Sequence, residues 1–83
     1  ENPIASSYYQ LMTLDNKLEI LTRTLNTRKE DLNKARLRFE SGMTSEIPYQ
    51  QAQVEYASTA AIIPDIQRQI KIKENELYLS ISL

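Results

Sequence analysis

The chain has 83 residues, of which 25% are charged and 41% hydrophobic, and its net charge at pH 7 is −1. This composition is typical of one small folded domain, and it argues against a disordered tail and against nucleic-acid binding through bulk electrostatics. The sequence contains no cysteine and no histidine, which excludes disulfide bonds, thiolate metal sites and the commonest general base.

A first helix is predicted over about residues 4–40, because apolar residues recur there at alternating steps of three and four. One series runs through Ile4, Leu11, Leu18, Leu25, Leu32 and Phe39, and the other through Leu14, Leu21 and Ala35. Arg28 alone interrupts this heptad seam. We expect its aliphatic stem to pack while its guanidinium reaches water, in preference to pairing with a carboxylate.

Three cations crowd the end of this helix, namely Lys34, Arg36 and Arg38. Their charges suit the negative end of the helix dipole, which makes a solvated face the simpler interpretation. The functional interpretation is a basic collar near the turn that meets an acidic partner.

A turn over about residues 41–45 follows, and it holds the only glycine of the chain, Gly42. Glycine tolerates positive φ and commonly ends helices, so Gly42 fits the left-handed position just after the first helix. Thr44 or Ser45 can cap the second helix through its hydroxyl, and Pro48 fits that helix's first turn. Met43 is expected to be exposed at the apex, where it either folds back to close the turn or contacts another protein.

A second helix is predicted over about residues 46–80. Its seam residues are Tyr49, Ala52, Tyr56, Thr59, Ile63, Ile66, Ile70, Lys73, Leu77 and Ser80. Further apolar residues widen this stripe beyond what a two-helix contact needs, so we expect Val54, Ala61 and Ile62 to stay partly bare. Pro64 predicts a kink, and the alternative is a true break that would give a three-helix bundle.

The two seams predict an all-α fold, an antiparallel two-helix coiled-coil hairpin that occupies residues 1–83 as a single unit. We expect Phe39 to lie near Ile47 and Leu32 near Val54. A lone hairpin buries only one stripe, so its stability is marginal unless it packs on something else. As an isolated fragment it is expected to dimerise into a four-helix bundle.

Two further observations concern the setting of the chain. No apolar run approaches the roughly 20 residues that span a bilayer, so we expect no direct membrane contact from this segment. The first residue is Glu1 in place of a methionine, which indicates a cut fragment of a larger protein or a processed product.

An enzymatic function is not expected, and neither is a cofactor or a metal. The acidic pairs Glu30–Asp31 and Glu74–Glu76 are adjacent or one residue apart. Members of such pairs do not share a helix face, so they do not converge on one site. The chain also lacks a set of nucleophile, base and orienting residue.

Several segments resemble the TolC-like outer-membrane efflux protein family. Residues 35–46 read ARLRFESGMTSE, and the family shows an Arg-aromatic-x-x-Gly-apolar-x-Ser turn between two helices. A Gln-Ala segment follows in both, here as QAQVE at residues 51–55. Similarity extends to ASSYY at 5–9, to IPDIQRQI at 63–70 and to ENEL at 74–77, so it covers nearly the whole chain.

The resemblance implies one periplasmic hairpin, similar to the first of the family's two repeats, from a protein that assembles as a trimer into a hollow α-barrel. It implies a channel component of a tripartite efflux or type I secretion system, facing the periplasm of a Gram-negative bacterium. The partner would be a periplasmic adaptor protein, docked at the turn. The residues implied in that contact are Arg38, Ser41, Gly42, Met43 and Thr44. Pro48 departs from the acidic residue that the family often carries there, and the alternatives are an adaptor-protein hairpin or an unrelated coiled-coil scaffold.

Overall fold

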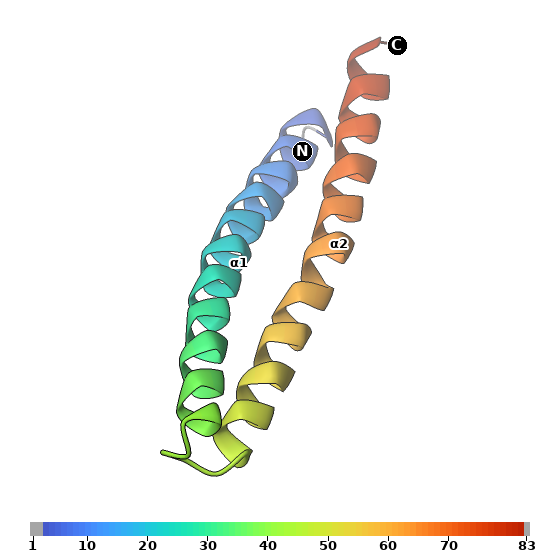
Figure 1. Cartoon of the computed structure of the whole chain (residues 1–83). Coiled ribbons are helices and arrows are strands. Elements are labelled where there is room, and N and C mark those ends of the chain that lie inside the picture. The colour runs from blue at the N-terminus through green and yellow to red at the C-terminus, as the bar shows by residue number, and fades with distance from the viewer. Residues whose placement is uncertain (1–2, 83) are drawn as a thin grey trace.

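The computed structural model describes residues 3–82 as two long helices joined by one reversal (Figure 1). Helix α1 spans Pro3–Glu40 and helix α2 spans Ile47–Ser82, and no strand occurs within the described part. The two helices run antiparallel and form a rod that measures 63 × 15 × 14 Å. The predicted all-α hairpin is therefore confirmed. Glu1, where the sequence indicates a cut fragment, lies outside the described residues.

The helices meet along the predicted seams except at the end away from the turn, where Ile4 and Ser80 are exposed. In α1 the half-buried side chains include Leu11, Leu14, Leu18, Leu21, Leu25, Leu32, Ala35 and Phe39. In α2 they include Tyr49, Ala52, Tyr56, Ile63, Ile70, Lys73 and Leu77. Only Ile66, at 3% exposure, and Thr59, at 7%, are buried among the described residues, and no described side chain is fully buried. The core is thus a single narrow stripe, as expected for two helices with no third layer.

Arg28 interrupts the seam in a different way from the one expected. Its Nη1 donates to Oε2 of Glu55 on α2 at 2.9 Å, so the side chain pairs with a carboxylate across the hairpin. Glu55 lies beside the seam residue Tyr56, which brings its carboxylate within reach of the half-buried guanidinium. The prediction that the Arg28 guanidinium would be solvated in preference to pairing with a carboxylate is therefore wrong, because the side chain of Glu55 on the facing helix is long enough to pair with it.

The pairing near the turn is also shifted from the expectation. Phe39 stacks on Tyr49, with ring centroids 5.8 Å apart and ring planes at 28°. Ile47 and Val54, the expected partners of Phe39 and Leu32, lie off the seam and are 61% and 65% exposed. The side chains that face α1 follow the heptad series of Tyr49, so that series determines the register. The exposure expected for Val54, Ala61 and Ile62 is confirmed.

Pro64 lies inside α2, which continues as one helix on both sides of it. The alternative of a break and a three-helix bundle is therefore wrong. The proline itself is exposed, while Ile63 and Ile66 beside it face the seam. Packing of those isoleucines keeps the helix continuous although the proline nitrogen has no hydrogen to donate.

Candidate functional site

The end of the rod is a tightly hydrogen-bonded turn. Gly42 has φ = 79°, in the left-handed region, as the sequence predicts. Its N–H donates to the Phe39 carbonyl at 3.0 Å, and the Met43 N–H donates to the Arg38 carbonyl at 2.9 Å. These two bonds form a Schellman motif, which satisfies carbonyls that α1 would otherwise leave open. Ser41 adds a bond from its hydroxyl to the Arg38 carbonyl at 3.1 Å.

Met43 stands at the apex of this turn with 75% of its surface exposed. No other large apolar side chain in residues 4–82 is so exposed. The alternative in which Met43 folds back to close the turn is therefore not what the structure adopts. The side chain is an unbranched, polarizable apolar group held out from a backbone that is itself fixed by hydrogen bonds. It offers a contact surface to another molecule.

Thr44 does not cap α2. The first bond of that helix runs from the Gln50 N–H to the Glu46 carbonyl at 2.9 Å, which gives Glu46 the N-cap position. The Thr44 Oγ1 is buried and has no hydrogen-bond partner, and Ser45 makes no side-chain hydrogen bond within residues 3–82. The prediction of a hydroxyl cap is wrong because the helix begins too late in the chain for Thr44 to reach its open N–H groups.

A recess of about 330 Å³ lies just above the turn, between the end of α1 and the start of α2. Its lining residues are Asp31, Lys34, Ala35, Arg38, Thr44 and Pro48. We call this the tip recess. The structure thus brings Arg38 and Thr44 together in one cavity. Ser41 and Gly42 form the turn, and Met43 lies outside the recess at the apex.

The tip recess was not predicted from the sequence. The signal that could have found it is the spacing of Asp31, Lys34, Ala35 and Arg38 at i, i+3, i+4 and i+7, which places them on one face of α1. Lys34 and Arg38 are exposed, and neither forms an ion pair within residues 3–82. Arg36, the third cation of the predicted collar, instead approaches Glu40 at 3.9 Å.

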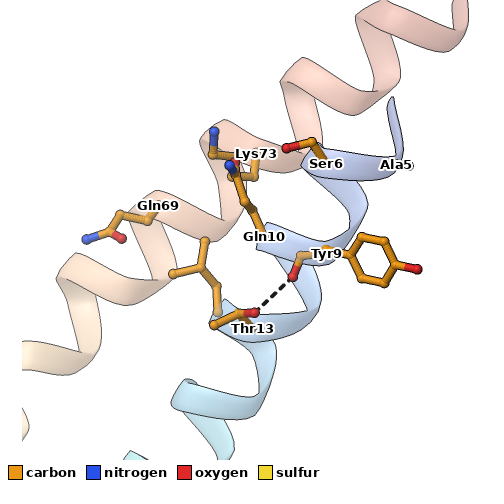
Figure 2. Close-up of a pocket in the computed structure, with 8 residues that line it drawn as sticks. Ala5, Ser6, Tyr9, Gln10, Thr13, Gln69 and Lys73 are labelled. Carbon is orange, nitrogen blue, oxygen red and sulfur yellow. Dashed lines mark hydrogen bonds between the residues drawn. The ribbon is translucent and has the colours of Figure 1, made fainter. Parts of the chain in front are cut away.

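A second groove lies at the opposite end of the rod, between the first turns of α1 and the last third of α2. Its volume is about 580 Å³, and it is lined by Ala5, Ser6, Tyr9, Gln10, Thr13, Leu14, Gln69 and Lys73. Figure 2 shows Gln10 next to Lys73, and the Tyr9 ring pointing away from the groove. The Thr13 hydroxyl donates to the Tyr9 carbonyl at 3.0 Å and so is already used within α1. Lys73 is likewise engaged, with Glu76 at 3.1 Å.

Within residues 3–82 no group of three acidic or other metal-ligating side chains converges. None of the helices described is both long and apolar enough to cross a membrane. The turn and its recess are a candidate site for binding another protein, because they combine the exposed Met43 side chain with the cations Lys34 and Arg38.

Comparison with known proteins identifies one family. The model of the family described as outer membrane efflux protein matches residues 2–82, which is nearly the whole chain. No curated protein and no solved structure gives a significant match.

Proposed function

Because the chain belongs to the outer membrane efflux protein family, we propose that it is one hairpin of the periplasmic α-barrel of such a channel. Proteins of this family are outer-membrane transport channels of Gram-negative bacteria, and they form trimers that work with adaptor proteins. In this proposal the hairpin stands in the periplasm as part of a tripartite efflux or type I secretion system. Its turn docks on the periplasmic adaptor.

The exposure of Met43 is the observation that carries the docking role. Two backbone hydrogen bonds fix the turn without any help from the Met43 side chain, so packing does not require an apolar residue there. An apolar side chain that is 75% exposed gains free energy when a partner covers it. Since the turn is already ordered, binding does not have to order the backbone first.

Replacing Met43 by aspartate tests the proposed function. The change should leave the helical content and the level of the protein unchanged, because Met43 contributes nothing to the seam. Loss of a buried methionine contact corresponds to about 1.5–3 kcal/mol, so adaptor affinity should fall by roughly 10- to 100-fold. Drug susceptibility of cells that carry the full-length channel should rise accordingly.

Met43→Leu is the matched control, since it keeps an apolar side chain of similar volume at the apex. It should preserve adaptor binding and resistance. Unimpaired efflux with Met43→Asp at normal protein level would contradict the docking role and leave Met43 without a partner.

An apolar stripe on the outer face of α2, opposite the seam, supports lateral packing against neighbouring helices. Val54 and Ile62 are 65% and 44% exposed, and Ala61 and Ile72 extend the same face. In the channel these residues would contact adjacent helices of the α-barrel. The 83-residue chain by itself presents the same stripe to a second copy, which can cover it in a four-helix bundle.

Sedimentation equilibrium of the 9.6 kDa chain at micromolar concentration should therefore give twice the monomer mass. The double variant Val54→Glu, Ile62→Glu should sediment as a monomer, because charges on the stripe must lose their hydration in the bundle. Gln53→Glu adds a charge away from the stripe and should remain dimeric. A folded, strictly monomeric parent chain would exclude the bundle.

A further inference from the structure

The tip recess contains polar groups that the hairpin itself leaves unused. Lys34 and Arg38 lie one helical turn apart on α1, and neither has an acidic partner within residues 3–82. Thr44 lines the same recess, and its Oγ1 is buried from solvent and makes no hydrogen bond. Like charges at this spacing repel each other, and a buried hydroxyl without a partner destabilises the fold. In the free hairpin the recess therefore holds two cations without an ion-pair partner among the described residues and one hydroxyl without a hydrogen bond.

One kind of group would satisfy all three side chains at once. A carboxylate placed between Lys34 and Arg38 would offset their repulsion, and its oxygens would accept hydrogen bonds from both cations. They would also accept one from the Thr44 hydroxyl once that side chain rotates, because its oxygen is buried in the free hairpin. Asp31, the remaining charged residue of the recess, precedes Lys34 by three residues and Arg38 by seven, or about 4.5 Å and 10 Å along the helix. Its negative charge therefore marks the far end of the recess, and the anion belongs at the end near the turn.

We propose that the tip recess receives the carboxylate of an aspartate or glutamate from the hairpin of the adaptor protein. This inference rests on the proposed docking at the turn, and it adds the chemistry that the partner must present there. Met43 provides the apolar contact at the apex, and the recess provides a charge-specific contact beside it. Such complementarity determines which adaptor binds and in which orientation, beyond adding affinity.

A second copy of the chain is the alternative source of that carboxylate. In such a copy Glu40, at the end of α1, is already near Arg36, at 3.9 Å. The two sources predict different covalent products, so one experiment separates them.

Zero-length crosslinking with a carbodiimide tests the inference in the full-length channel mixed with its adaptor. The reagent activates a carboxyl group, and the Lys34 amine attacks it to form an amide while the reagent leaves as a urea. We expect mass spectrometry to find Lys34 joined to an aspartate or glutamate in the adaptor hairpin. Lys34→Arg should abolish this product, and Lys29→Arg, which changes an exposed lysine outside the recess, should not.

A photoreactive residue at Met43, used in parallel, identifies the adaptor and tests the docking itself. If Met43 captures the adaptor and Lys34 joins no adaptor carboxylate, the inference is wrong while the proposed function stands. A Lys34 product with Asp31, or with an acidic residue of a second copy, would also overturn it. If Met43 captures no adaptor, the proposed function and this inference both fail.

Thr44→Val provides an independent test, because it should affect folding and binding in opposite directions. Valine fills the same space without a buried, unpaired hydroxyl, so the melting temperature of the free protein should rise or stay the same. Adaptor affinity should fall about five- to tenfold, since the carboxylate loses one donor. Thr44→Ser keeps the donor and should recover most of that affinity. Unchanged adaptor binding by Thr44→Val would contradict the inference.

Discussion

Replacing Pro64 by alanine is expected to raise the free energy of unfolding by about 3 kcal/mol, the usual cost of a proline in a helix interior. Pro64 lies within the continuous helix α2 and is exposed, so alanine neither empties a core site nor breaks a contact in the seam. The substitution restores the N–H that can donate to the Ala60 carbonyl, one turn earlier. It also relieves the steric restriction on Ile63, the residue before the proline.

Thermal unfolding followed by circular dichroism should show this gain as an increase in Tm of about 10–20 °C for a chain of this size. The protein concentration has to be the same for all variants, because self-association shifts Tm. Pro48→Ala is the matched control. Pro48 lies in the first turn of α2, where its nitrogen has no helical acceptor, so the change should have little effect. An equal or lower Tm for Pro64→Ala would show that the helix depends on its proline.

Gly42→Val should destabilise the turn by about 1–2 kcal/mol and strongly impair efflux by the full-length channel. The cost arises from the backbone, because φ is 79° and a β-branched residue avoids this region. It does not arise from crowding, since a Cβ built on Gly42 meets no atom within 4 Å. The turn must therefore rearrange, which moves Met43 and opens the recess. Trimer formation should persist, because the exposed apolar stripe of α2 that is proposed to contact neighbouring helices is untouched.

Asparagine is the informative control at this position. Its side chain is about as large as that of valine, but it enters the left-handed region at much lower cost. Gly42→Asn should therefore keep most of the stability, adaptor binding and drug resistance. If asparagine and valine were equally harmful, side-chain bulk at the tip would be responsible, and the role assigned to the positive φ would be wrong.

The features that the sequence predicted are those that depend on local rules. The heptad series of Leu18 and Tyr49 determined which faces meet, because helical periodicity repeats regardless of tertiary context. Gly42 was predictable since it is the only residue in the chain that takes positive φ without a steric cost. The match to the family confirmed the resemblance that the segment around Gly42 had indicated.

The features that the sequence missed depend on how the two helices lie against each other. Glu55 reaches Arg28 only because of the register of α2 against α1, which no single-helix pattern contains. Thr44 lost its predicted capping role because α2 begins at Ile47, and helix boundaries shift easily by a residue or two. The tip recess combines residues from both helices and the turn, so it depends on how the two helices approach each other near the turn.

The proportions of the hairpin have a mechanical consequence for the docking site. A rod 63 Å long and about 15 Å wide acts as a lever, with the turn at one end and the start of α1 and the end of α2 at the other. Any small tilt imposed at that other end becomes a large sideways displacement of Met43. The local hydrogen bonds fix the conformation of the turn, but they do not determine the direction in which it points. Its position in space is determined by whatever holds the opposite end of the rod.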